Sequence, residues 1–275
     1  MTTYAEQASW REIQKFLPEQ FQLQPGQEPQ EEWWPWRQHR IHLDCYRQPD
    51  APLKVILFHG VGTNGRQMST ILGAPLARRG FETIAIDMPE YGVTQTGQGP
   101  LVRYDDWVQA GSDLVDAELA KDGRPIVLYG LSAGGMETYH VAALNKKVQG
   151  IVGMTFLDQR VQQVVDQTSL NLLLSRVGLP LAKLTAMTPL AGMRMPMAWA
   201  SKMHLLVNDK AALRACLAPA RARDRRGPGD PLVRRPRGAA AGRPAGVHPA
   251  LEPLQDRRAA RPRHGACAGG AGERR

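Results

Sequence analysis

The chain has 275 residues, a formal net charge of +9 and three cysteines. No stretch approaches 18 consecutive apolar residues, which excludes a transmembrane helix, and three cysteines cannot form a disulfide framework. The first residues lack the basic and apolar regions of a signal peptide, so we expect a cytoplasmic protein.

The positive charge is confined to the end of the chain. Residues 1–210 carry a net charge of −1, whereas residues 211–275 carry +10. Ala, Arg, Gly and Pro make up 48 of these last 65 residues, and the segment has no Ile, Phe, Trp, Tyr or Met. Such a composition cannot bury enough apolar surface to offset the entropy cost of ordering the chain. Residues 211–275 are therefore predicted to be a disordered tail.

Three interpretations of this tail compete. An Arg-rich arm could bind nucleic acid, or the segment could be an ordinary solvated low-complexity tail. A shifted reading frame is the third, because the codons of Ala, Arg, Gly and Pro begin with two G or C bases. The change in composition at residue 211 is abrupt, which favours a tail read out of frame. The tail has no Lys and no aromatic residue to stack on bases, so no nucleic-acid partner is expected.

The rest of the chain divides into three parts. Residues 1–38 form an N-terminal extension with a short helix from Tyr4 to Phe16, and residues 39–160 form the core domain. Within the core, short apolar runs predict strands at 39–46, 52–60, 81–87, 125–130 and 148–158, and helical spacing predicts helices at 66–79, 104–121 and 133–145. Strands that alternate with helices indicate a mainly parallel sheet with helices on both faces, which is an α/β fold.

The third part, residues 161–210, is apolar, rich in Met and interrupted by Pro180, Pro189 and Pro196. It is predicted to be helical. Such a segment is either a plain helical layer over the sheet or a cap over an apolar pocket. Met side chains adapt to apolar ligands of varied shape, which favours the cap.

A G-x-S-x-G motif directly follows the strand at 125–130. It consists of Gly130, Leu131, Ser132, Ala133 and Gly134, and the next helix starts at once. A strand, a tight turn and a helix are the setting of a nucleophile elbow, in which a strained turn exposes the Ser hydroxyl. Gly130 and Gly134 would keep the neighbouring chain from clashing there. Ser132 is therefore the candidate nucleophile.

A second glycine-rich loop, His59-Gly60-Val61-Gly62, follows the strand at 52–60. Gly60 would let this loop approach the elbow. We expect the backbone N–H groups of Val61 and Ala133 to form an oxyanion hole there. The chain has neither a P-loop nor a dinucleotide-binding glycine motif, so a phosphate site is not favoured.

These motifs resemble those of the α/β-hydrolases, and in particular of the monoacylglycerol lipase, lysophospholipase and serine aminopeptidase-like group. The resemblance is carried by FHGVG at 58–62, IDMPEYG at 86–92 and YGLSAGG at 129–135, where Glu90 replaces a family glycine. It covers residues 39–210. The resemblance implies an α/β-hydrolase fold with a helical cap and a Ser nucleophile. No cofactor or metal is expected, because no cluster of His, Cys and Asp has the spacing of metal ligands.

The resemblance also implies an acid and then a His after the nucleophile, on two further core strands. In this chain that region is the tail, which contains no apolar strand. His248 and His264 lie there, with Asp230, Glu252 and Asp256 nearby. Chain order permits these residues, but a disordered arm cannot hold a base within hydrogen-bonding distance of Ser132. We therefore expect the last core strands, the acid and the His to be missing.

The other histidines are weaker candidates for the base. His59 belongs to the oxyanion loop and is expected to be structural, and His140 lies two turns along the nucleophile helix. Asp158 and His204 follow Ser132 in the right order, but a cap helix is a loose mount for a base. His39 and His42 lie on the first predicted strand.

The sequence thus predicts a serine hydrolase that cleaves a small-molecule carboxylic ester and is crippled in this chain by the loss of the acid and the His. The alternative is a non-catalytic binding protein on a hydrolase scaffold, in which Ser132 is dispensable. Substrate identity and oligomeric state are left open.

Overall fold

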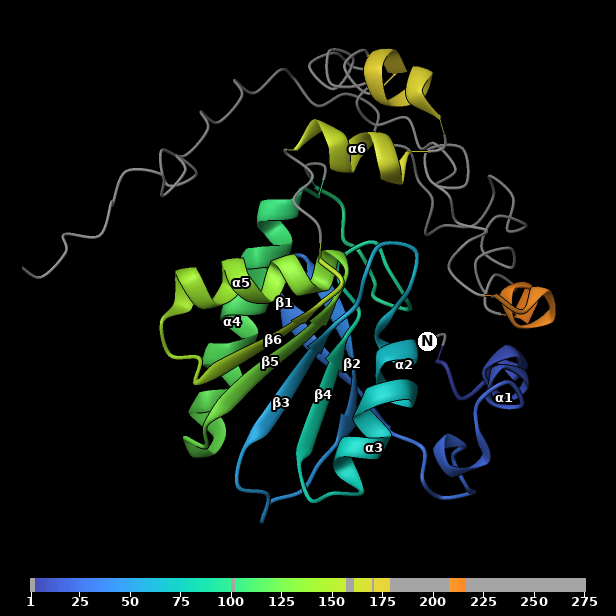
Figure 1. Cartoon of the computed structure of the whole chain (residues 1–275). Helices are drawn as coiled ribbons and strands as arrows, with labels where there is room; N and C mark the ends of the chain where they lie inside the picture. The colour runs from blue at the N-terminus through green and yellow to red at the C-terminus, as the bar shows by residue number, and fades with distance from the viewer. Residues whose placement is uncertain (1–2, 100–101, 157–160, 170, 179–207, 216–275) are drawn as a thin grey trace, which may run out of the picture. The chain divides into compact units, whose positions relative to one another are not determined.

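A computed structural model describes residues 3–99, 102–156, 161–169, 171–178 and 208–215. Its strands are β1 (Gln30–Trp36), β2 (His39–Tyr46), β3 (Lys54–Phe58), β4 (Glu82–Ile86), β5 (Ile126–Leu131) and β6 (Gly150–Met154). Its helices are α1 (Ala8–Gln14), η1 (Glu19–Phe21), α2 (Gly65–Met68), η2 (Ser69–Gly73), α3 (Ala74–Ala77), α4 (Tyr104–Asp122), α5 (Ala133–Asn145), α6 (Gln162–Thr168) and η3 (Leu174–Gly178) (Figure 1).

The six strands form one sheet in the order β1-β2-β4-β3-β5-β6. β3 pairs in parallel with both β4 and β5, and β5 pairs in parallel with β6. β2 is antiparallel to its neighbours β1 and β4. The chain runs from β3 to one side and then crosses to the other, so β3 marks the point where the strand order reverses. Open α/β sheets bind ligands beyond the carboxyl ends of the strands at such a point.

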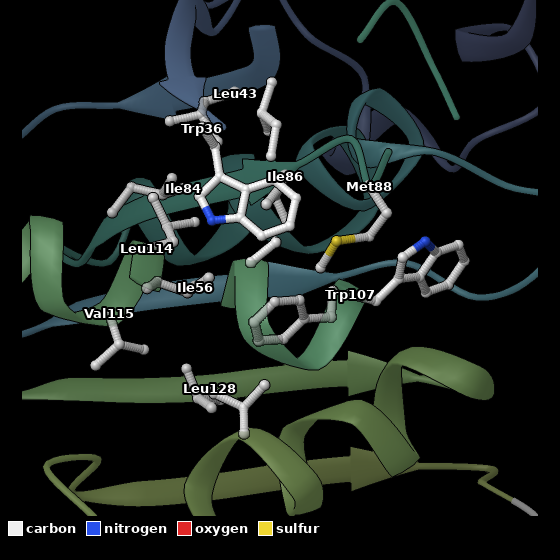
Figure 2. Close-up of a cluster of buried hydrophobic side chains, with 14 of the residues drawn as sticks. Trp36, Leu43, Ile56, Ile84, Ile86, Met88, Trp107, Leu114, Val115 and Leu128 are labelled. Atoms are coloured by element: carbon white, nitrogen blue, oxygen red, sulfur yellow. The ribbon is translucent and has the colours of Figure 1, made fainter. Parts of the chain in front are cut away.

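Helices cover both faces of the sheet, with α4 and α5 on one face and α2 and α3 on the other (Figure 1). Successive residues of β3 therefore enter two separate cores. Ile56 and Phe58 pack in the larger core with residues of α4 such as Leu114 (Figure 2). Val55 and Leu57 pack in the smaller core. This double burial explains why β3 is an uninterrupted apolar run in the sequence.

The predicted core elements are confirmed. The helix predicted at 66–79 is present as α2, η2 and α3, with a wide turn at η2 just before Pro75, which has no N–H to donate. α4 ends at Gly123, where a positive φ of 72° suits glycine. The helix predicted from Tyr4 to Phe16 is shorter and forms α1.

β1 was not predicted, because residues 1–38 were assigned to an extension outside the sheet. β1 carries Trp33 and Trp34, and its Pro35 lies opposite Arg40 of β2. Pro is tolerated on an edge strand, where one side of the backbone has no ladder to complete. The run of tryptophans followed by Pro concealed this strand in the sequence.

The sheet ends at β6, and no strand follows it among the described residues. Ile151, Val152 and Met154 of β6 are 43%, 41% and 42% exposed, although they belong to a parallel strand of the type usually buried. Within the described residues, β6 is therefore an edge strand with apolar side chains open to solvent.

The predicted cap and tail lie mostly outside the described residues. α6 and η3 agree with a helical segment after residue 161. Residues 210–215 are helical as well, and Ala212 is buried, so helix extends into the first residues of the segment predicted to be disordered. No helix within the described ranges is long and apolar enough to cross a membrane.

Candidate active site

Ser132 occupies the turn between β5 and α5, as the motif predicts. Its backbone has φ 57° and ψ −118°, a conformation that costs a non-glycine residue free energy. The turn is held by a hydrogen bond from the Ser132 N–H to the carbonyl oxygen of Met154 (2.8 Å). The Ser132 carbonyl accepts from the N–H groups of Gly135 and Met136. Ser132 is exposed, so its hydroxyl is presented to solvent beyond the end of β5.

The elbow glycines are required by close backbone packing. A Cβ on Gly130 would lie 2.0 Å from the Gly134 carbonyl oxygen, and a Cβ on Gly134 would lie 2.4 Å from the Phe58 carbonyl oxygen. No side chain larger than hydrogen fits at these distances. Gly130 brings β5 against the start of α5, and Gly134 brings α5 against the end of β3.

The loop after β3 runs directly beside the elbow. A Cβ on Gly60 would lie 3.1 Å from the Cβ of Ser132 and 3.6 Å from its Oγ. Val61 follows Gly60, and Ala133 opens α5, whose first N–H groups have no partner within the helix. No backbone hydrogen bond engages the Val61 N–H among the described residues. The two segments named by the sequence therefore meet at Ser132.

His59 has the structural role expected from the sequence. It is fully buried, and its Nε2 accepts a hydrogen bond from the Met88 N–H (3.1 Å), so its proton resides on Nδ1 and is donated to the Gly60 carbonyl (2.8 Å). Burial lowers the pKa of His59, which keeps the ring neutral. Its ring also contacts those of Tyr91 and Trp107. With both nitrogens engaged, His59 is not a base for Ser132.

The other described histidines are also occupied away from Ser132. His39 Nδ1 accepts from the Gly97 N–H, His42 lies in a buried ion-pair network, and His140 Nδ1 meets the Tyr104 hydroxyl at 2.9 Å. Within the described ranges, no histidine or carboxylate is hydrogen-bonded to the Ser132 hydroxyl. The remaining candidates, Asp158, His204, Asp230, His248, Glu252, Asp256 and His264, lie outside the described residues.

A buried network of charges that was not predicted faces the loop after β4. His42 contacts Glu31 through Nε2 (3.0 Å) and Asp87 through Nδ1 (3.2 Å). Burial alone would lower the pKa of His42, but these two carboxylates raise it to about 9. Arg66 makes a bidentate pair with Asp44 and also reaches Glu31 at 3.2 Å. The only indication of this network in the sequence was the charged or titratable residue at every second position of HRIHLDCY (39–46), at Arg40, His42 and Asp44.

Part of this network has the composition of a metal site. One ligand atom each from Glu31, His42 and Asp44 lie within 4.8 Å of one another. The guanidinium of Arg66 already pairs with Asp44 and Glu31, and His42 is itself cationic at neutral pH. These contacts fit an internal ion-pair network better than a cation site.

A second missed group is Glu137, one turn into α5. It is fully buried, and neither carboxylate oxygen has a hydrogen-bond partner among the described residues. Burial raises its pKa well above the usual value, which favours the neutral acid. Helical periodicity indicated only that this residue lies on α5.

The strand order and the elbow together define the chain as an α/β-hydrolase. The model of the alpha/beta hydrolase family matches residues 55–270, which is most of the chain. The chain therefore belongs to the alpha/beta hydrolase family. No curated protein matches the chain.

Three solved structures illustrate the similarity. A CIB-like hydrolase from Thermoplasma acidophilum is 17% identical with a TM-score of 0.41, and the match covers 50% of this chain and 69% of that one. Monoglyceride lipase from Saccharomyces cerevisiae is 20% identical with a TM-score of 0.45, covering 57% and 51%. An alpha/beta hydrolase from Novosphingobium aromaticivorans is 21% identical with a TM-score of 0.39, covering 51% of each chain. The match spans about half the length of the last two proteins.

Proposed function

We propose that this member of the family is a serine hydrolase that acts on a small-molecule carboxylic ester, with Ser132 as its nucleophile. The strained and exposed position of Ser132 between β5 and α5 carries the proposal. Strain of this kind persists only where the surrounding structure enforces it, and it is typical of functional sites.

In the proposed reaction the Ser132 oxygen attacks the carbonyl carbon of the ester and loses its proton to a base. The carbonyl oxygen becomes an oxyanion, which the N–H groups of Val61 and Ala133 stabilise. The alcohol then leaves with a proton, and water hydrolyses the acyl-enzyme to release the acid and regenerate Ser132. The position of Gly60 against Ser132 supports this pairing of loop and elbow.

The described residues supply no base for this reaction, and we propose that the chain is accordingly slow. Loss of the histidine of a catalytic triad reduces kcat about 10⁶-fold, although backbone donors retain some activity. The family match continues to residue 270, so His248 and His264 fall within the matched range. They are the histidines whose replacement must be tested.

The test is hydrolysis of p-nitrophenyl esters of increasing acyl length by the full chain. We expect slow turnover that Ser132→Ala abolishes and Ser9→Ala on α1 leaves unchanged. Turnover that survives Ser132→Ala would overturn the assignment of the nucleophile. His204→Ala, His248→Ala and His264→Ala are expected to leave the rate unchanged. A large loss in one of them would identify the base and overturn the proposal that the base is missing.

The Met-rich segment before residue 207 supports an apolar acyl chain. A rate that rises from acetate to octanoate esters is therefore expected. Absence of any ester or amide hydrolysis, together with binding of such ligands, would favour the non-catalytic binding protein instead.

A further inference from the structure

The loop that carries Val61 is tied down at both ends by the segment that follows β4. At its start, the Met88 N–H donates to His59 Nε2, and His59 Nδ1 donates to the Gly60 carbonyl. At its end, the Gly65 N–H donates to Asp87 Oδ1 at 2.6 Å. A Cβ on Gly65 would lie 2.9 Å from the Ile86 carbonyl carbon, so this approach needs glycine. The position of the loop therefore depends on Asp87 and Met88.

Asp87 is itself held from several sides. It is fully buried, and its Oδ2 accepts hydrogen bonds from the Val93 N–H (2.8 Å) and from the hydroxyl of Tyr4 (2.7 Å). Burial alone would raise the pKa of Asp87, but its ion pair with His42 lowers it to about 2, so the carboxylate is charged at neutral pH. A charged acceptor makes strong hydrogen bonds with these donors.

Tyr4 comes from the far N-terminal segment and is locked into the core. It is 2% exposed, and the N–H groups of Tyr4 and Ala5 donate to the two carboxylate oxygens of Glu31 at 2.9 and 2.8 Å. The Tyr4 ring makes edge contacts with His42 and Trp10. The N-terminal segment thus delivers one phenolic hydroxyl to a buried carboxylate 83 residues away.

An apolar contact couples the same two segments. Tyr4, Trp10 and Ile13 form a buried cluster with Val93, the residue whose N–H binds Asp87. Ala215, in the helical residues 210–215, packs against this cluster. The N-terminal segment therefore contacts the loop after β4 in two ways: the Tyr4 hydroxyl donates to Asp87, and the apolar cluster packs against Val93.

We propose that Tyr4 is a positioning residue for the oxyanion loop, because its hydroxyl fixes the Asp87 carboxylate that anchors the loop bearing Val61. This inference rests on the proposed function, since it assigns the loop a part in the reaction. Tyr4 is remote in sequence from every motif of the site. Its action is indirect, through Asp87 and Gly65.

Tyr4→Phe in the full chain tests this, because it removes one hydroxyl and keeps the ring. The matched control is Tyr46→Phe. The hydroxyl of Tyr46 in the parent chain donates to the Gln27 carbonyl and does not touch Asp87. Amide hydrogen exchange is measured at Gly65 and Val93, with the Gly123 amide of the α4 cap as internal reference. We expect Tyr4→Phe to speed exchange at Gly65 and Val93 about tenfold. Unchanged exchange at Gly65 would overturn the proposal.

A second readout separates positioning from a purely structural role. The reaction of Ser132 with a fluorophosphonate is followed by mass spectrometry over a range of concentrations. Tyr4→Phe is expected to lower the limiting rate about ten- to a hundredfold without changing the half-saturating concentration. Faster exchange with an unchanged limiting rate would overturn the positioning role. If Ser132 in the parent chain never reacts, the proposed function fails and the positioning role with it, while exchange still shows whether Tyr4 holds the loop.

Discussion

Gly130 and Gly134 meet so closely that a Cβ on Gly130 would lie 2.0 Å from the Gly134 carbonyl oxygen. Gly130→Ala therefore forces β5 away from α5. We expect it to lower the free energy of unfolding by at least about 1–3 kcal/mol. Urea unfolding measures this change. Gly150→Ala in β6 is the matched control, because the nearest atom to its Cβ is 3.9 Å away. Equal effects of the two substitutions would contradict the close packing of the elbow.

The backbone strain at Ser132 gives a second prediction. Glycine adopts φ 57° without the steric cost that alanine and serine share. Ser132→Gly is therefore expected to be about 1 kcal/mol more stable than Ser132→Ala, although both lose the nucleophile. The comparison is made by thermal or urea unfolding. A Ser132→Ala chain at least as stable as Ser132→Gly would show that the turn is unstrained.

Glu137 is a buried acid without a partner among the described residues, so its replacement should stabilise the protein. Its folded pKa is raised, whereas the unfolded side chain ionises near pH 4.5. Stability should therefore fall as the pH rises above 4.5, and Glu137→Gln should remove this contribution. Glu137→Met should add about 1–3 kcal/mol at pH 7, measured by urea unfolding.

A second buried glutamate provides the control for this prediction. Glu118 of α4 pairs with Lys54, Arg47 and Lys121. Burial alone would raise its pKa, but the contacts with Arg47 and Lys121 lower it. Glu118→Gln removes one buried carboxylate from Lys54 and Arg47, which keep Asp122 and Glu82 respectively, and should destabilise the fold by about 1–3 kcal/mol. Destabilisation of similar size at Glu137 would mean that its carboxyl is satisfied after all.

The ion-pair network around His42 predicts a loss of stability in alkali. The pKa of His42 is about 9 in the folded protein and 6.5 in the unfolded chain. The contribution of His42 to the free energy of unfolding is therefore complete below pH 6.5 and disappears as the pH rises through 9. The shift corresponds to about 3 kcal/mol. The charged and titratable groups that face His42 or its partners include Tyr4, Glu31, Asp44, Tyr46, His59, Arg66 and Asp87.

Urea unfolding at several pH values between 6 and 10 measures this effect. His42→Gln should be less stable than the parent at pH 6, because Glu31 and Asp87 lose the positive charge of His42. The difference should shrink towards pH 10. A constant difference across this range would show that His42 is neutral in the folded protein.

The central sheet and the elbow were predictable because their signals are local. The apolar runs of β3, β4 and β5 follow from burial on both faces, and the need for glycine at Gly130 follows from its contact with Gly134, a few residues along the chain. β1 was not predictable, because Pro35 in a tryptophan-rich run is typical of neither a strand nor a helix. Only its pairing with β2 reveals it.

The contacts of the N-terminal segment could not be predicted from the sequence for a different reason. Tyr4 meets Asp87 across 83 residues, and no periodicity connects two such positions. The burial of Glu137 likewise depends on how α5 packs on its neighbours. The contact of Tyr4 with Asp87 and the burial of Glu137 can be identified only in the folded structure, where segments distant in sequence lie together.

Fluorophosphonate labelling of the full chain, with peptide mapping of the modified residue, tests the central claim most directly. We predict that Ser132 is the labelled residue, that the reaction is slow compared with that of a complete serine hydrolase, and that Ser132→Ala abolishes it. A label at another residue, or none at Ser132, would contradict the assignment of the nucleophile. Rapid labelling of Ser132 would instead show that the chain holds a working base.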